Sequence, residues 1–292
     1  MSGRPAGTDV RALVELVRLP AALTVPGDSL AGAAAAGWPL GRRHWLMPMA
    51  SACLYWAGMA LNDYADRDLD AVERPERPIP SGRIRPRRAL QVAAGLTAAG
   101  VGIAGVAGGR RSLAVAVPLA ATVWTYDLVA KPGPLGPVAM ACARGLDVLL
   151  GATDPRAAAR PALTIAAHTV GVTVLSRGEV HGSRPSVAAA AATSTAALAA
   201  RVGLPRRGRS PWVSATTAAL AGTYVATVGR AQARAAYDPG AATVRAATGA
   251  GVRGAIPLQA ALTARAGSVR TALGLVAMGP VARAAAKVVS PT

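Results

Sequence analysis

The chain has 292 residues, of which 52% are hydrophobic and only 16% are charged, against about 25% charged in ordinary soluble domains. Its mean hydropathy is +0.34 and its formal charge is +18, but the arginines stand between long apolar runs with no nucleic-acid-binding motif beside them. This composition argues against a disordered chain, a soluble enzyme and a nucleic-acid partner, and it predicts a polytopic membrane protein.

Apolar segments of about 20 residues, the length that crosses a bilayer, recur along the chain. We predict nine of them, at residues 12–38, 44–62, 88–107, 112–130, 135–153, 161–178, 186–202, 211–230 and 268–287. A further stretch, 241–262, contains Arg245 and Arg253 and either spans the bilayer or lies at its interface. Because runs this long favour helices in lipid, we predict an all-α bundle of about nine transmembrane helices forming one domain, residues 1–292.

Several ionisable residues fall inside these segments. Asp28 lies in the first segment, where it either lines a substrate pocket or caps a broken helix. Arg144 and Asp147 are three residues apart in the fifth segment, so we expect them to form a structural ion pair. His168 lies in an apolar run and is expected to be a packed interior histidine.

The acidic residues are concentrated after the second segment. Six of the fourteen fall between Asp63 and Glu76. Asp63, Asp66 and Asp70 have the spacing i, i+3, i+7, which places three carboxylates on one helical face. Asp68 points away from that face and is expected to be a solvated loop charge.

Carboxylates gathered on one face repel each other unless cations neutralise them. Hard oxygen ligands select Mg²⁺ or Ca²⁺, and Mg²⁺ commonly combines one or two carboxylates with substrate phosphates. Arg74 and Arg77 follow directly in the sequence, and arginines beside such a cluster suit a diphosphate. The residues therefore predict a metal–diphosphate site at the end of the second segment.

Residues 62–70 carry a more specific signal. Asn62, Asp63, Asp66 and Asp70 match the NDxxDxxxD signature of the UbiA superfamily of intramembrane prenyltransferases, and the Arg-Pro-x-Pro-Ser-Gly sequence from Arg77 agrees with it. The number of segments also resembles that family. The resemblance implies a helical bundle with a central cavity open to lipid, in which Mg²⁺ at Asp-rich loops binds an isoprenyl diphosphate.

Family roles carry over to individual positions of this chain. The resemblance implies that Asp63, Asp66 and Asp70 act in catalysis as metal ligands, with Lys131 contacting the diphosphate after the fourth segment. It also implies substrate contacts from a second group of residues: Asn62, Arg74, Arg77, Glu179 and Arg184.

The second family motif departs from the pattern. It is expected at 176–184, where Ser176, Glu179 and Ser183 keep the spacing but only Glu179 is a carboxylate. We expect this array to face the first one, with Glu179 as an additional metal ligand. Either His181 assists it, or arginines of this loop hold the diphosphate instead. Such a departure is typical of a divergent branch, and the EboC-like group is the one that we consider.

These observations predict Mg²⁺-dependent transfer of an isoprenyl group from an isoprenyl diphosphate to an aromatic or similar lipid-soluble acceptor. A non-catalytic protein that binds or moves an isoprenoid-linked metabolite is the alternative, and the long apolar segments argue against a soluble isoprenyl diphosphate synthase. Cations are more numerous on the side that holds the N-terminus and residues 63–87. The positive-inside rule therefore predicts a multi-pass protein of the cell membrane with its Asp-rich loops in the cytoplasm.

Overall fold

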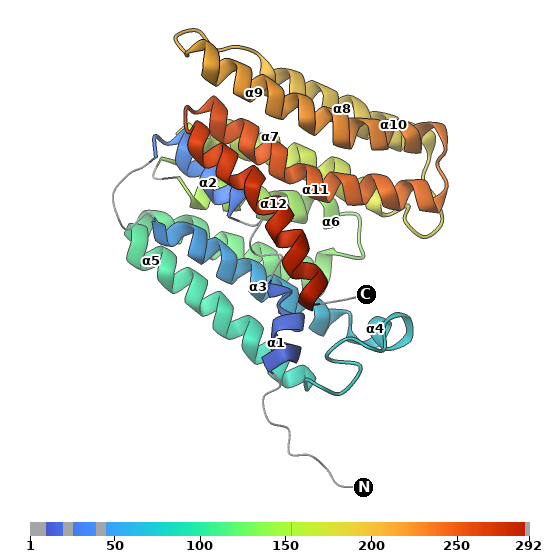
Figure 1. Ribbon diagram of the computed structural model, residues 1–292. Helices are drawn as coiled ribbons and strands as arrows, with labels where there is room; N and C mark the ends of the chain where they lie inside the picture. Colours follow the sequence, from blue (N-terminus) through green and yellow to red (C-terminus); the bar gives the residue numbers. More distant parts are fainter. Residues whose placement is uncertain (1–9, 20–25, 39–44, 153, 290–292) are drawn as a thin grey trace, which may run out of the picture.

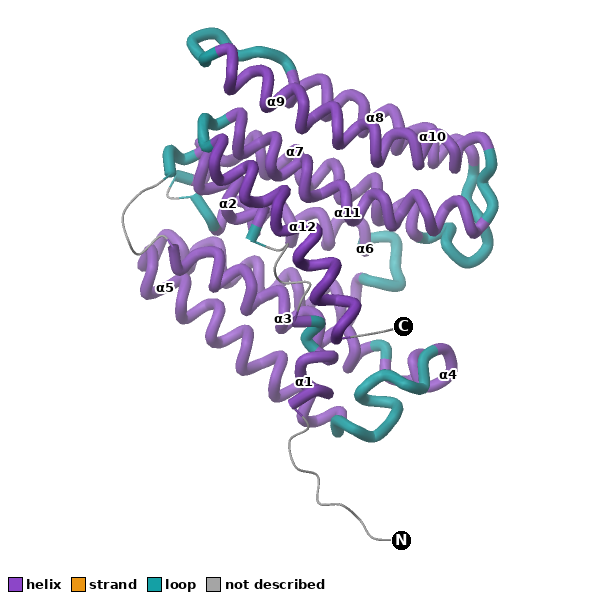
Figure 2. The backbone as a smooth tube through the Cα atoms, viewed as in Figure 1, coloured by secondary structure: helices purple, strands orange, loops and turns teal. Residues whose placement is uncertain are grey.

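A computed structural model describes residues 10–19, 26–38, 45–152 and 154–289 of the chain. These residues form helices joined by turns and loops, and no strand occurs among them. Figure 1 shows the helices packed side by side in a bundle, and Figure 2 shows how little of the described chain lies outside helices. The predicted all-α bundle is confirmed.

The N-terminal part differs from the prediction of one continuous span over 12–38. It contains two short helices, α1 (Val10–Leu16) and α2 (Gly27–Ala35), and residues 20–25 lie outside the described part. Helix α3 (Met47–Ala65) follows, and its end leads into the short helix α4 (Arg67–Glu73). The predicted second span therefore continues three residues beyond Asn62, which brings Asp63 into the last turn of α3.

The predicted third and fourth spans form the two arms of one hairpin. Helix α5 (Pro86–Thr125) continues into a π-helical turn, η3 (Tyr126–Ala130), but the backbone breaks at Gly109, where φ is 63°. Glycine suits this left-handed conformation because it has no Cβ. Indole Nε1 of Trp124 donates a hydrogen bond of 3.1 Å to the Thr97 hydroxyl oxygen. This contact shows that the second arm folds back along the first.

The remaining helices follow in chain order. They are α6 (Gly136–Leu150), α7 (Pro155–Ser176), α8 (Pro185–Gly203), α9 (Pro211–Tyr224), η4 (Val225–Gly229), α10 (Arg230–Tyr237), α11 (Ala241–Arg265) and α12 (Val269–Val289). Proline begins α7, α8 and α9, where its missing N–H group leaves no intrahelical hydrogen bond unmade. The stretch 241–262, which the sequence left undecided, forms the continuous helix α11.

Large apolar side chains are exposed on several helices. Five that are each more than half exposed lie on α5, α7, α11 and α12: Val106, Val117, Leu163, Val252 and Leu273. In the described residues, two helical stretches, Pro86–Ala130 and Pro155–Ser176, are long and apolar enough by composition to cross a membrane. The other predicted spans also form helices, but these are shorter or less uniformly apolar.

Helices α2 and α6 approach each other through a reciprocal pair of glycines. A Cβ added at Gly32 would lie 1.8 Å from the carbonyl oxygen of Val148, and one added at Gly151 would lie 1.8 Å from that of Ser29. Small residues allow such backbone contact between membrane helices. This close approach keeps α2 against α6 and so fixes the position of Asp28.

We expect Gly32→Ala to lower the free energy of unfolding by about 1–3 kcal/mol, because the added methyl group must push two backbones apart. Denaturant unfolding of the purified protein in detergent measures this loss. Gly102→Ala is the matched control, since nothing lies within 4 Å of a Cβ at that position. An equal loss in the control would contradict the importance of the glycine contact.

Candidate functional site

The predicted aspartates lie where α3 passes into α4. Asp63 occupies the last turn of α3, Asp66 stands at the junction, and Asp70 lies in α4. Asp63 is 4% exposed and Asp70 is 2% exposed. Buried carboxylates require cationic or hydrogen-bonding partners. We call these three residues, together with Asp127, the aspartate cluster.

Three cations reach the aspartate cluster from different parts of the chain. Arg77 Nη1 lies 2.5 Å from Asp70 Oδ2 and 3.3 Å from Asp63 Oδ1, so one guanidinium joins two carboxylates. Arg18 Nη2, just after α1, lies 3.2 Å from the same Asp63 oxygen. Lys131, at the end of η3, forms an ion pair with Asp66. The positive charges thus converge on all three predicted aspartates.

Asn62 holds the fourth carboxylate of the cluster. Its Nδ2 donates a hydrogen bond of 3.2 Å to Oδ1 of Asp127, which is buried in η3. Asp127 precedes Lys131 by four residues, so both side chains project from the same face of the helix end. This contact connects the end of α3 to the end of the α5 hairpin, 65 residues away in the sequence.

The other predicted substrate-binding residues lie at the surface. Arg74 is exposed after α4 and makes no ion pair within the described residues. Arg184 is exposed at the start of α8. Glu179 is half-buried, and its backbone carbonyl oxygen accepts a hydrogen bond of 2.7 Å from Arg245 Nη1. In the described part of the chain, no hydrogen bond or ion pair joins Glu179 to the aspartate cluster.

The second motif does approach the region of Lys131 through a different residue. Arg177 donates a hydrogen bond to the carbonyl oxygen of Gly133, two residues after Lys131. The Ser176 hydroxyl donates a hydrogen bond of 2.9 Å to the Thr173 carbonyl oxygen. The side chain of His181 is exposed. The loop after α7 is therefore tied to the loop before α6, at the same end of the bundle as the aspartates.

The chemistry of the aspartate cluster fits Mg²⁺ bound together with a phosphate compound. Among the described residues, no three His, Cys, Asp or Glu side chains are gathered as a ready-made metal site, and arginine and lysine pair with the carboxylates of the cluster. Mg²⁺ needs one or two carboxylates when substrate phosphates supply further oxygens. Asp63 and Asp70, joined by Arg77, provide such a pair, whereas Asp66 stands at the break between α3 and α4 and pairs with Lys131.

The expected Arg144–Asp147 ion pair is wrong. Arg144 Nε instead lies 2.9 Å from Asp28 Oδ2. Gln259 Nε2 donates a hydrogen bond of 2.7 Å to the other carboxylate oxygen of Asp28. Asp147 Oδ2 accepts a hydrogen bond of 2.8 Å from the Ser51 hydroxyl. The spacing along one helix pointed to Asp147 as the partner of Arg144. In the structure, α2 places the Asp28 carboxylate against Arg144 instead. Asp28 is thus fully buried in an ion pair, and its side chain does not cap α2.

The expectation for His168 is confirmed. The imidazole is 6% exposed, and its Nδ1 lies 2.9 Å from the Tyr224 hydroxyl.

Sequence reasoning missed two residues of the site, Asp127 and Arg18. Asp127 gave a usable signal, because it stands four residues before Lys131 at the end of an apolar segment and acids are scarce in this chain. Arg18 gave none, since its contact with Asp63 joins residues 45 positions apart. Such a contact depends on how α1 packs against the end of α3.

The sequence model of the UbiA prenyltransferase family matches residues 22–231, more than half of the chain. A digeranylgeranylglyceryl phosphate synthase of Methanopyrus kandleri is 40% identical over 131 residues, which are 43% of this chain and 46% of that protein. The chain matches less than half the length of such curated relatives.

Solved structures show the same fold. A structure described in connection with the biosynthesis of digeranylgeranylglyceryl phosphate synthase in membranes has a TM-score of 0.63 at 16% identity, and the match covers 89% of this chain and 99% of that one. A UbiA homologue from Archaeoglobus fulgidus bound to DMAPP and Mg²⁺ has a TM-score of 0.56 at 13% identity, with 82% and 98% covered. The chain belongs to the UbiA prenyltransferase family.

Proposed function

We propose that the protein transfers an isoprenyl group from an isoprenyl diphosphate to a lipid-soluble acceptor inside the membrane. The observation that carries the proposal is the aspartate cluster, in which three cations from separate segments converge on buried and half-buried carboxylates at the end of a helical bundle. Similarity to a homologue bound to DMAPP and Mg²⁺ supports the same substrate class. For the acceptor, we propose only that it is soluble in lipid.

In the proposed reaction, the bond between the allylic carbon and the diphosphate oxygen breaks, and its electron pair leaves with the diphosphate. Arg77, Lys131 and the exposed Arg74 bind the diphosphate oxygens and stabilise the departing charge, because they are positioned before the reaction begins. The allylic cation is then attacked by the acceptor's nucleophile, which loses a proton. The apolar helices keep bulk water away from the cation.

Mg²⁺, held by Asp63, Asp66 and Asp70, would neutralise the diphosphate and make it a better leaving group. We place Glu179 and Arg184 at the edge of the same site as substrate contacts, since Arg177 ties their loop to the loop after Lys131. Asn62 positions Asp127 beside the metal ligands. One carboxylate in the second motif is expected to give weaker metal binding there than at the first.

Removal of divalent ions should abolish transfer. We expect EDTA treatment of the purified protein to stop release of diphosphate from geranylgeranyl diphosphate in lipid nanodiscs, and added Mg²⁺ to restore it. The proposed Mg²⁺ would supply the charge that neutralises the diphosphate next to Asp63, Asp66 and Asp70. Released diphosphate is measured directly. Turnover that persists in EDTA would contradict a metal-dependent site.

A non-catalytic isoprenoid-binding protein is the second candidate, because the second motif keeps only one carboxylate, Glu179. The two candidates differ in turnover. Radiolabelled geranylgeranyl diphosphate that is retained by the protein but never releases diphosphate, with a membrane lipid extract as the acceptor source, would favour the binder. Release together with a new labelled lipid supports the transferase.

We further propose that the protein spans the cell membrane several times with the aspartate cluster facing the cytoplasm. Loops at that end carry more arginine and lysine than those at the other end, as the positive-inside rule requires. Ser81→Cys, in a chain with both native cysteines replaced by serine, reports the orientation. A membrane-impermeant maleimide should label it in inside-out vesicles and not in intact cells.

A further inference from the structure

A second charged site lies away from the aspartate cluster. A cavity of about 570 Å³ opens between the end of α2, the start of α7, the end of α8, the α8–α9 loop and the end of α11. Six of the residues that line it are arginines: Arg156, Arg160, Arg201, Arg206, Arg209 and Arg265. No aspartate or glutamate is among its lining residues in the described part of the chain. We call it the arginine cavity.

The arginine cavity and the aspartate cluster lie at opposite ends of the bundle. Helix α6 begins just after Lys131, beside the aspartates, and ends just before α7, whose first turns line the cavity. Its 15 residues separate the two ends by about 22 Å at 1.5 Å per residue. The cavity is therefore not a part of the proposed active site.

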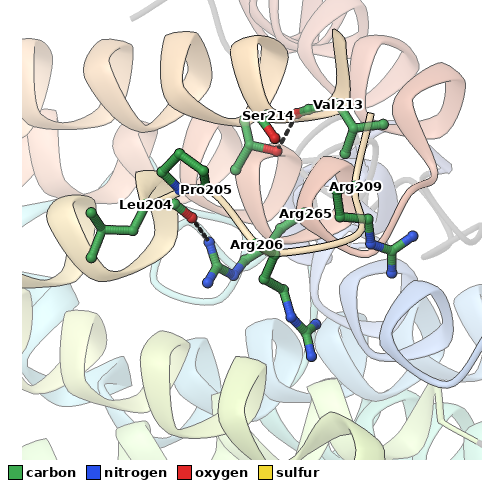
Figure 3. A pocket seen from close by; sticks show the side chains of 8 residues that line it. Leu204, Pro205, Arg206, Arg209, Val213, Ser214 and Arg265 are labelled. Carbon is green, nitrogen blue, oxygen red and sulfur yellow. Dashed lines mark hydrogen bonds between the residues drawn. The ribbon is translucent and has the colours of Figure 1, made fainter. Parts of the chain in front are cut away.

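The cavity holds uncompensated positive charge. Arg265 Nη1 donates to the carbonyl oxygens of Val202 and Leu204, at 2.5 Å each, which fixes it against the end of α8. Figure 3 shows a smaller neighbouring pocket, whose lining shares Arg206, Arg209 and Arg265 with the arginine cavity. Across the described residues, none of the six arginines forms an ion pair. Because like charges gathered in one hollow repel each other, the arrangement favours an anion between them.

Arginines contribute the largest share of the cavity's lining. Small or apolar residues from α2, α7 and α11 complete it, among them Ala34, Ala157 and Leu262. Guanidinium groups bind phosphate oxygens in pairs, and basic pockets between membrane helices accept lipid headgroups. A cavity of this size falls in the range of ligand pockets, about 300–1,000 Å³.

We propose that the arginine cavity binds a phosphate group, and that its apolar walls favour the phosphate of an anionic lipid over a soluble phosphate compound. The charged headgroup would lie among Arg160, Arg201 and Arg206, with the acyl chains leaving along the apolar side. The ligand would hold together α2, α7, α8 and α11, which meet at this cavity.

The test uses the full-length protein in detergent micelles doped with phosphatidic acid or phosphatidylcholine, or with inorganic phosphate in the buffer. We expect phosphatidic acid to raise the melting temperature and to stay bound in native mass spectrometry. The double variant Arg160→Gln/Arg201→Gln should bind it at least about tenfold more weakly, since charge-assisted hydrogen bonds are lost.

Arg110→Gln/Arg111→Gln is the matched control. It removes the same charge at the same end of the bundle, at exposed positions that do not line the cavity. Unchanged phosphatidic acid binding in this control supports the proposal. Equal weakening in both double variants, or equal stabilisation by phosphatidylcholine, would overturn it. The same stabilisation by inorganic phosphate at the same concentration would overturn the preference for a lipid.

Discussion

Asp66→Asn should lower isoprenyl transfer by about 10²–10³-fold, the loss that follows when one preorganised electrostatic group is removed from an active site. Asp66 is suited to this test because its side chain is 24% exposed and pairs with Lys131 at the surface of the site. The substitution keeps the shape of the residue and removes its charge. Turnover is measured with isoprenyl diphosphate and a membrane lipid extract.

Asp68→Asn provides the control for this prediction. Asp68 lies two residues away in the same acidic segment. Its side chain is 87% exposed, and its one ion pair among the described residues is with the neighbouring Arg67. We expect transfer by this variant to equal that of the native protein. Full activity in Asp66→Asn, or an equal loss in Asp68→Asn, would remove the role that we assign to the aspartate cluster.

Arg144→Met should produce the largest loss of stability, about 3–5 kcal/mol, because it leaves the Asp28 carboxylate buried without its counterion. The Asp28 side chain has no exposure, and its pairing with Arg144 joins α2 to α6 across 116 residues of sequence. The free energy of unfolding, measured with denaturant in detergent, reports the loss.

The second partner of this ion pair supplies an internal check. Asp28→Asn in the Arg144→Met background should recover part of the stability, since the double variant no longer contains an unpaired charge. Arg111→Gln, at an exposed position with no ion pair in the described chain, should leave stability unchanged. Losses that simply add in the double variant would show that Asp28 and Arg144 do not act as a pair.

Sequence reasoning identified the features that depend on local spacing. The apolar runs gave the helices, and the i, i+3, i+7 spacing placed Asp63, Asp66 and Asp70 together at one helix end. Arg77 was chosen because it follows the acidic segment directly, and in the structure its guanidinium contacts Asp63 and Asp70. These features could be predicted because each is set by residues within a few helical turns, whereas Lys131, which pairs with Asp66, was chosen by resemblance to the family.

Features that depend on packing between distant segments could not be predicted in this way. Arg144 has a carboxylate three residues away, yet it binds Asp28 because the close contact of Gly32 with α6 brings α2 alongside. The six arginines of the arginine cavity likewise come from α7, α8, α11 and the α8–α9 loop, and none of these elements supplies more than two of them. The spacing of residues along the sequence does not predict contacts between segments that are far apart in the chain.

The guanidinium of Arg77, shared by two carboxylates, has a consequence for how the site fills. A bare divalent ion arriving alone must compete with an occupant that is already in place, whereas an ion that arrives complexed with diphosphate offers Arg77 a new counterion. If the cluster binds metal and diphosphate as proposed, loading would be an exchange of partners in which ion and substrate enter together. Arg77 would then compete with free Mg²⁺ or Ca²⁺ for Asp63 and Asp70.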